Sequence, residues 1–93
     1  MTYVVVFYDI SDNRARQRVA DRLLAKGLTR IQRSVFIGRG GLALAKDLAR
    51  YLARLINVGD SLVIMVVGEE SIRTMISIGR GEVNVNASAV KVI

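Results

Sequence analysis

Two short runs of the sequence are apolar on both of the faces that a β-strand would present. In "YVVVFYDI" (3–10), alternate side chains fall into two sets, and both sets stay apolar until Asp9. The run "LVIMVVG" (62–68) shows the same pattern. Strands of this kind are covered on both sides. The chain must therefore fold around a sheet whose two faces are protected, with a carboxylate at the end of one strand.

Two helices are predicted between these runs. Ser11 or Asp12 caps the first helix, and Gly27 ends it. A second helix is predicted over residues 42–56, where leucines four residues apart share a face. The apolar stripe expected on the first helix consists of Ala15, Val19, Ala20, Leu23 and Leu24.

The remaining segments are extended or short. Residues 28–38 suit a β-strand, but their polar centre indicates a kink, a bulge or a tight hairpin between two strands. Residues 69–79 predict a short helix, and weak alternation in 82–86 and 89–93 predicts two strands. The order β-α-β(β)-α-β is that of the α+β, ferredoxin-like fold, an antiparallel sheet with two helices on one face.

This fold leaves the second face of its sheet open. The open face should carry apolar residues from the first strand and from 62–67, and the hydrophobic content of 52% is high for 93 residues. Burying that face requires a partner sheet, and a symmetric homodimer supplies one economically. We therefore expect a homodimer with one ferredoxin-like domain over residues 1–80 and a C-terminal strand segment over 81–93.

The chain contains neither cysteine nor histidine. That composition excludes thiol nucleophiles, thiolate zinc sites and imidazole bases. Any metal must be a hard cation bound by oxygen, and any general acid or base must be a carboxylate, a lysine or a tyrosine. No apolar run approaches the roughly 18 residues of a membrane span, and the first residues lack the pattern of a signal peptide. A cytoplasmic location is expected.

Positive charge gathers in the first part of the chain. The net charge is +6, and residues 1–54 carry eleven Lys or Arg against four Asp or Glu. A basic region of this kind suits a polyanion such as nucleic acid, although an ordinary solvated face is the alternative. Four of its residues recur every fourth position and form one ridge on the first helix. The candidate phosphate-binding residues are Arg14, Arg16, Arg18, Arg22, Lys26, Arg30 and Arg33.

Asp9 has two interpretations. It could accept hydrogen bonds from backbone amides around Ser11–Asn13, as aspartates in turns commonly do. Alternatively, it lies on the dimer face, where a two-fold axis brings two copies together. Two such charges about 5 Å apart repel by about 3 kcal/mol at an effective dielectric near 20. A bridging Mg²⁺ would relieve this repulsion and activate water against a phosphodiester.

Over residues 4–79 the chain resembles the family of CRISPR-associated protein two, the small subunit of the CRISPR adaptation machinery. The resemblance lies in "VVVFYDISDNRARQRVADRLLAKGLTRIQRSVFIG", in "GDSLVIMVV" and in "SIG" at 77–79. It implies that Asp9 is a Mg²⁺ ligand and catalytic residue at the interface of a ferredoxin-like homodimer. The C-terminal strand would complete the partner's sheet.

The same resemblance implies further site residues. Ser34, Val35 and Phe36 match the family's "SVF" segment near the cleft, so Ser34 and Phe36 are expected to line it. Basic residues that face nucleic acid in the family match Arg14, Arg16, Arg18 and Arg33. The segment "GRGG" (38–41) departs from the family, in which many members have an acidic residue after "SVF".

The resemblance implies a homodimer that binds duplex DNA and works with CRISPR-associated protein one, the integrase, to insert new spacers. Some members of the family are metal-dependent endonucleases acting on single-stranded RNA or double-stranded DNA, and in others the aspartate is dispensable for adaptation. Whether this chain is an enzyme therefore stays open. Two other functions remain: a stand-alone endoribonuclease of toxin type, and a non-catalytic ferredoxin-like regulatory dimer.

Overall fold

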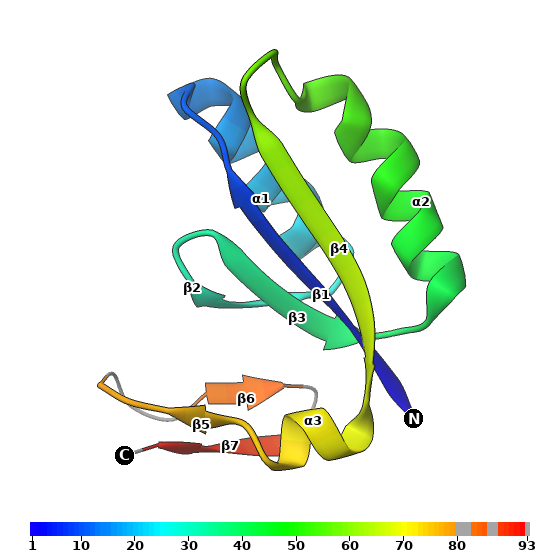
Figure 1. Cartoon of the computed structure of the whole chain (residues 1–93), viewed down its shortest axis with the longest axis vertical. Helices are drawn as coiled ribbons and strands as arrows, with labels where there is room; N and C mark the ends of the chain where they lie inside the picture. The colour runs from blue at the N-terminus through cyan, green and yellow to red at the C-terminus, as the bar shows by residue number, and fades with distance from the viewer. Residues whose placement is uncertain (80–82, 86–87, 93) are drawn as a thin grey trace.

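A four-stranded antiparallel sheet with two helices on one face forms the body of the molecule (Figure 1). The computed structural model describes residues 1–79, 83–85 and 88–92, the last two ranges as backbone. The strand order is β2-β3-β1-β4, which confirms the ferredoxin-like arrangement. The strands are β1 (Thr2–Asp9), β2 (Thr29–Gln32), β3 (Val35–Arg39) and β4 (Ser61–Gly68). The helices are α1 (Asn13–Ala25), α2 (Leu42–Leu52) and the short 3₁₀ helix η1 (Ala53–Leu55).

The segment 28–38 is a hairpin that also contains an irregularity. Strands β2 and β3 pair antiparallel on either side of a turn at Arg33 and Ser34, and their register shifts between Arg30 and Gln32. Two of the three predicted alternatives therefore occur together. The polar residues Arg33 and Ser34 form the turn, whereas Gln32 is the last residue of β2.

The main core lies between the sheet and the two helices. Alternate residues of β1 point toward the helices, and Val4 and Val6 are completely buried there. Each large side chain buried in this way stabilises the fold by about 1.5–3 kcal/mol relative to exposure. The helix residues in this core are Ala15, Val19, Ala20 and Leu23 of α1 and Ala45, Leu48 and Leu52 of α2.

Helix α1 begins as the sequence predicts. Asp12 is its N-cap, with the Ala15 amide donating to Asp12 Oδ2 at 2.8 Å, and Gly27 follows its end with a positive φ of 87°. The predicted apolar stripe is wrong at Leu24, which is 49% exposed. Successive helical residues are rotated by about 100°, so Leu24 lies toward solvent when its neighbour Leu23 points into the core.

The C-terminal part of the chain differs from the predicted helix over 69–79. Helix α3 covers only Glu69–Arg73, and β5 (Ile76–Ser77) then pairs in parallel with β7 (Ser88–Val92). Strand β6 (Val83–Val85) pairs antiparallel with β7. The Met75 amide closes α3 on the Ile72 carbonyl at 3.3 Å, and the β-branched Ile76 that follows suits a strand.

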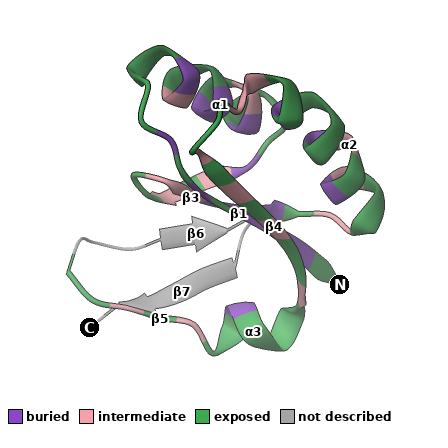
Figure 2. Ribbon diagram, turned by 45° about the horizontal axis from the view of Figure 1, so that its top comes forward, coloured by how far each residue is buried: buried purple, intermediate pink, exposed green. Residues whose placement is uncertain are grey.

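This C-terminal part covers half of the sheet face that lies opposite α1 and α2. Helix α3 lies on that side (Figure 2), and its Ile72 packs in a second core with Tyr3, Val5 and Ile37. The prediction that this whole face needs a partner is therefore wrong for the half near Tyr3, because the chain folds back over it. The other half remains open, and its exposed apolar side chains are Phe7, Val63 and Met65.

The predicted boundary between residues 80 and 81 falls at residues 80–82, outside the described part of the chain. Strand β7 pairs with β5 and β6 of its own chain. Completion of a partner's sheet by the C-terminal strand stays a prediction. Among the residues that the structure describes, no helix is both long enough and apolar enough to cross a membrane.

Candidate active site at the end of strand β1

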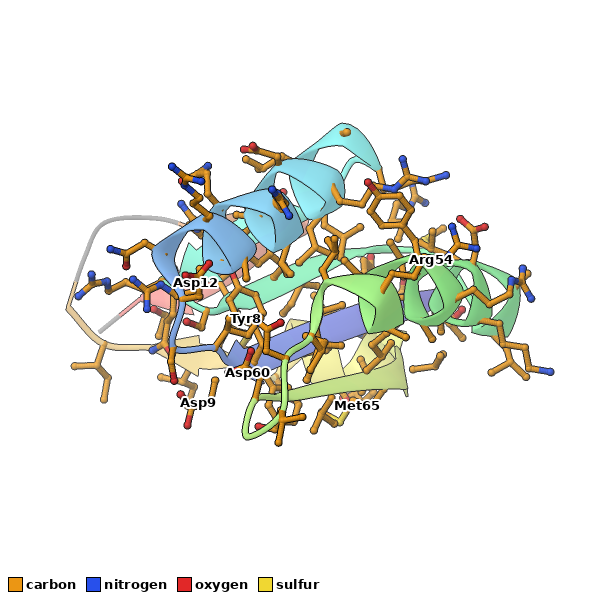
Figure 3. The ribbon with its side chains drawn as sticks, turned by 90° about the horizontal axis from the view of Figure 1, so that it is seen from above. Tyr8, Asp9, Asp12, Arg54, Asp60 and Met65 are labelled. Atoms are coloured by element: carbon orange, nitrogen blue, oxygen red, sulfur yellow. The ribbon has the colours of Figure 1, made fainter. Side chains whose placement is uncertain are left out.

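Asp9 is the last residue of β1, and it is paired with Ser61, the first residue of β4. Strand alternation places its side chain on the face that carries Phe7 and Met65. Figure 3 shows Asp9 and Met65 pointing away from the helices, whereas Tyr8 points toward them. Asp9 is exposed, so its carboxylate lies at the open end of the half-covered face.

Two other carboxylates hold the backbone around Asp9. Asp12 caps α1 as described above. Asp60, in the loop before β4, accepts hydrogen bonds from the Ser11 amide at 3.2 Å and from the Asn57 amide at 3.1 Å. Asp60 therefore ties the loop that follows Asp9 to the loop that leads into β4. Both loops lie at the same end of the sheet, because β1 ends where its antiparallel neighbour β4 begins.

Arg16 holds the same loop from the other side. One guanidinium nitrogen donates to the backbone carbonyls of Ile10 and Ser11, each at 3.0 Å, and another contacts the side-chain oxygen of Asn13. The sequence predicts Arg16 to bind nucleic acid. In the structure its donors are directed at the protein backbone, so its main contribution is to fix the turn beside Asp9.

The carboxylate of Asp9 itself has no hydrogen-bond or ion-pair partner among the residues that the structure describes. The structural interpretation of Asp9 required it to accept from amides around Ser11–Asn13. Asp60 takes the Ser11 amide instead, and Asp12 takes that of Ala15. A carboxylate that the fold does not use is available to a ligand, which is consistent with the functional interpretation.

The oxygen atoms near Asp9 suit a hard cation. Carboxylate and hydroxyl oxygens, here from Asp9 and its pair Ser61, are the donors that Mg²⁺ prefers. Within the described ranges no group of three or more acidic, histidine or cysteine side chains could enclose a metal. At the end of β1 the described residues therefore supply one carboxylate without a partner, that of Asp9, and the rest of any coordination sphere would come from water, substrate or a second copy.

The "SVF" segment lies beside the end of β1. The Tyr8 amide donates to the Ser34 carbonyl at 3.1 Å, which brings the β2–β3 turn to the edge where Asp9 lies. Phe36 is completely buried and stacks with Tyr8, with ring centroids 6.2 Å apart. Within one chain, Ser34 is thus near Asp9, whereas Phe36 lies in the core on the opposite face of the sheet.

The residues of the predicted basic ridge on α1 lie in two different environments. Arg14 and Arg18 are exposed to solvent. Arg22 lies over the Tyr51 ring, with its guanidinium carbon 3.9 Å from the ring centroid, and Lys26 forms a salt bridge of 3.2 Å with Asp47. The helix continues to rotate over these positions, so the ridge begins in solvent and ends at the contact with α2.

The two other basic candidates lie on the hairpin. Arg30 lies over the Phe36 ring on the helix side, 5.0 Å from its centroid. Arg33 is exposed in the β2–β3 turn, next to Ser34. Arg33 therefore lies at the end of the sheet that carries Asp9. It is better placed than Arg30 to contact a phosphate there.

Asp60 and Ser61 are site residues that the sequence pattern alone did not predict. The signal was present in "GDSLVIMVV", because an antiparallel neighbour of the first strand must begin where that strand ends. A carboxylate just before such a strand falls beside the residue at the end of its neighbour. Identifying the pair required knowing that β4 lies next to β1.

The profile of the family described as CRISPR associated protein Cas2 matches residues 1–75. The chain belongs to the Cas2 family. A relative from Pyrobaculum aerophilum, named CRISPR-associated endoribonuclease Cas2 2, is 49% identical over 78 residues, which are 83% of this chain and 86% of the relative. A CRISPR-associated endonuclease Cas1/endonuclease Cas2 fusion from Thermoproteus tenax is 46% identical over 77 residues, which are 82% of this chain and 29% of the fusion.

Solved structures show the same fold. A hypothetical protein from Thermus thermophilus is 32% identical, with a TM-score of 0.63 over 94% of this chain and 92% of that chain. Streptococcus pyogenes Cas2 at pH 6.5 is 25% identical, with a TM-score of 0.63 over 74% of this chain and 89% of that chain. The family membership therefore agrees with the strand order and with the resemblance noted in the sequence.

Proposed function

We propose that two copies of this chain form a homodimer whose paired Asp9 side chains make a Mg²⁺-dependent endonuclease site, and that the dimer serves in CRISPR adaptation. The observation that carries this proposal is the exposed carboxylate of Asp9, which has no partner among the described residues. The fold places it at the edge of an exposed apolar surface rather than in a turn, where it would have a structural role.

The open half of the sheet supports a dimer. Phe7, Val63 and Met65 are 37%, 44% and 46% exposed on neighbouring strands. In addition, β4 is an edge strand of the four-stranded sheet, and an eight-residue edge that is largely apolar is a template for pairing with another chain. A second copy would cover the apolar side chains, and its C-terminal strand would pair with this edge after leaving β5 or β6, its neighbours within one chain.

The same arrangement supports a metal site made by two chains. Asp9 of each copy would hold Mg²⁺, which supplies charge neutralisation and an activated water when bound. Arg33 and Arg14, both exposed, are the basic residues of the hairpin turn and of the first turn of α1. Their role is to orient the phosphodiester at this edge, and the loop held by Asp60 and Arg16 fixes the direction of Asp9.

The relatives support the substrate and partner classes. The name endoribonuclease in the Pyrobaculum relative favours RNA as the cleaved substrate. The fusion from Thermoproteus tenax carries a Cas1 part and a Cas2 part in one polypeptide, which supports an integrase of the Cas1 type as partner. We infer that the dimer joins that partner while its arginines hold duplex DNA by the phosphates.

The decisive experiment is a cleavage assay with labelled single-stranded RNA and duplex DNA, with Mg²⁺ or with a chelator. Asp9→Asn should reduce the Mg²⁺-dependent rate by about 100-fold or more, because losing a metal ligand should cost at least as much as losing a residue that orients one. Asp21→Asn is the matched control, because Asp21 is exposed on α1 and bonded only locally to Gln17. Its rate should match the wild type.

Mixing the variant with wild type tests the shared site. If both carboxylates are needed, the rate falls with the square of the wild-type fraction, whereas independent sites give a linear fall. Cleavage retained by purified Asp9→Asn would contradict the proposal. RNA cleavage by a monomer, measured by sedimentation at the assay concentration, would favour the stand-alone endoribonuclease instead.

A further inference from the structure

Helix α2 and η1 carry a second line of basic residues, apart from the ridge on α1. Lys46, Arg50 and Arg54 are four residues apart and all are exposed. At 1.5 Å per residue they extend over about 12 Å along one side of the helix. Arg50 is only distantly paired, 3.9 Å from Asp47, whose other oxygen accepts from Lys26. The guanidinium groups at 50 and 54 are therefore largely available to a ligand.

The two helices bring this line close to the exposed part of the α1 ridge. Lys26 meets Asp47, and one turn earlier Arg22 meets Tyr51, so α1 and α2 run antiparallel. A further turn along α1 brings Arg18 level with η1, which packs against α1. Arg54 belongs to η1. The exposed cations therefore lie beside the contact between the two helices, and we call this region the seam. Its residues are Arg18 of α1, Lys46 and Arg50 of α2, and Arg54 of η1.

Acidic side chains do not balance this seam. Helices α1, α2 and η1 contain seven basic residues but only two acidic ones, Asp21 and Asp47. Asp21 accepts a hydrogen bond from Gln17 at 2.8 Å, and Asp47 is shared between Lys26 and Arg50. Like charges four residues apart destabilise a helix unless a counter-charge is present, and the chain supplies few.

The seam and Asp9 lie on opposite sides of the sheet. Figure 3 shows Arg54 at the helix layer, whereas Asp9 points away from it. Helix α3, on the far side with Asp9, begins with Glu69 and Glu70. The helix side is thus basic, whereas the charges of α3 on the far side are mixed, because Arg73 pairs with Glu70. A nucleic-acid backbone bound along α2 therefore does not pass over Asp9 of the same protein molecule.

We propose that Lys46, Arg50 and Arg54, together with Arg18, form a phosphate-binding surface for a nucleic-acid backbone, separate from the site at Asp9. The ligand class rests on the proposed function, and the location rests on the charges and exposures of α1, α2 and η1. Arginines on a rigid helix suit phosphate oxygens. The aromatic ring of α2, Tyr51, is 38% exposed but already has the Arg22 guanidinium against one face, so the surface contacts the backbone more than the bases.

Binding of fluorescent duplex DNA and single-stranded RNA of equal length at several salt concentrations tests this surface. Arg50→Gln/Arg54→Gln should weaken binding and lower the slope of log K against log salt by about 1.8 for duplex DNA and about 1.4 for single strands. Arg39→Gln/Arg73→Gln removes the same charge elsewhere, at the end of β3 and in α3, and should leave the slope unchanged. A loss with one probe alone identifies that nucleic acid as the ligand.

A cross-linking experiment locates the nucleic acid independently of cleavage. Because the chain contains no cysteine, Ala49→Cys on the outside of α2 and Ser71→Cys on α3 each accept one photoreactive label, and both positions are exposed. DNA should cross-link to the label at 49 and not to the label at 71. Equal cross-linking at both positions, or a salt slope that the double variant at 50 and 54 shares with wild type, would overturn the proposal. These results decide the matter even if the wild type cleaves nothing.

Discussion

The carboxylate of Asp60 and the backbone amide of Ser11 are joined by a hydrogen bond of 3.2 Å between loops that are 49 residues apart in sequence. Ser11 follows Asp9 by two residues, and Ser61, which follows Asp60, is the residue paired with Asp9. This bond therefore fixes both strands at the point where the candidate catalytic carboxylate leaves the sheet. Although the bond joins two loops and does not involve Asp9, it sets the position of the backbone that carries Asp9.

Replacing Asp60 should change both stability and cleavage. Asp60→Ala removes the acceptors of two backbone amides, and each lost hydrogen bond of this kind costs about 1 kcal/mol. We expect a lower urea midpoint and, because Asp9 loses its fixed direction, a lower kcat with little change in KM. Asp60→Asn keeps one acceptor oxygen and should give intermediate values. An Ala variant with a wild-type midpoint would show that water replaces the carboxylate without cost.

Arg14 and Arg16 should respond differently to loss of charge, although they are two residues apart. Arg14 is exposed, whereas the donors of Arg16 are used by the Ile10 and Ser11 carbonyls. Arg14→Gln should lower the salt slope of duplex binding by about 0.9, the value for one phosphate contact. Arg16→Gln should leave the slope nearly unchanged and lower the free energy of unfolding. The opposite pattern would mean that Arg16 turns toward nucleic acid in the complex.

Gly38 should not tolerate a side chain. A Cβ at this position would lie 2.8 Å from Leu28 Cγ, in the core between β3 and the start of β2. Overpacking of this kind typically costs about 1–3 kcal/mol. Gly38→Ala should therefore lower the thermal midpoint. Gly68→Ala is the matched control, since a Cβ there meets nothing within 4 Å and its φ is negative. Equal shifts of the thermal midpoint in the two variants would show that overpacking is not the cause.

A charge on the open half of the sheet should weaken the proposed dimer. Met65 is 46% exposed in the middle of β4, beside Val5 of β1. Met65→Glu should raise the dimer Kd at least tenfold, which corresponds to about 1.4 kcal/mol, as measured by sedimentation equilibrium. Val58→Glu is the control, because Val58 is fully exposed in the loop before Asp60. A dimer equally sensitive to both changes would place the interface elsewhere.

The sequence was sufficient to predict the sheet, its two helices and the face on which Asp9 lies. Period-two alternation in β1 determines that face, and burial of Val4 and Val6 against the helices confirms it. The sequence was insufficient where a side chain is long or where contacts are distant. Arg16 is equally compatible with solvent and with the backbone, and only the fold shows which groups lie within its reach.

The periodicity of apolar residues also did not predict contacts between segments that are distant in sequence. Nothing local in residues 69–79 indicates that Ile72 packs on Tyr3 and Val5, so the sequence predicted a face that is more open than the one observed. The basic residues Lys46, Arg50 and Arg54 have the spacing of an ordinary solvated helix face, so the sequence alone does not indicate a binding surface there. Their meaning depends on Arg18 and Arg54 lying at the same seam, which the antiparallel contact of α1 and α2 reveals.

Strand β1, which ends at Asp9, has a neighbouring strand on each side for most of its length. Central strands are the segments whose amide hydrogens exchange last, because their opening requires opening of the whole domain. The amides of Val4 to Val6 should therefore exchange at the rate of global unfolding. The backbone that leads to Asp9 therefore keeps its position up to the temperature at which the domain itself unfolds, whereas the exposed carboxylate can still change rotamer.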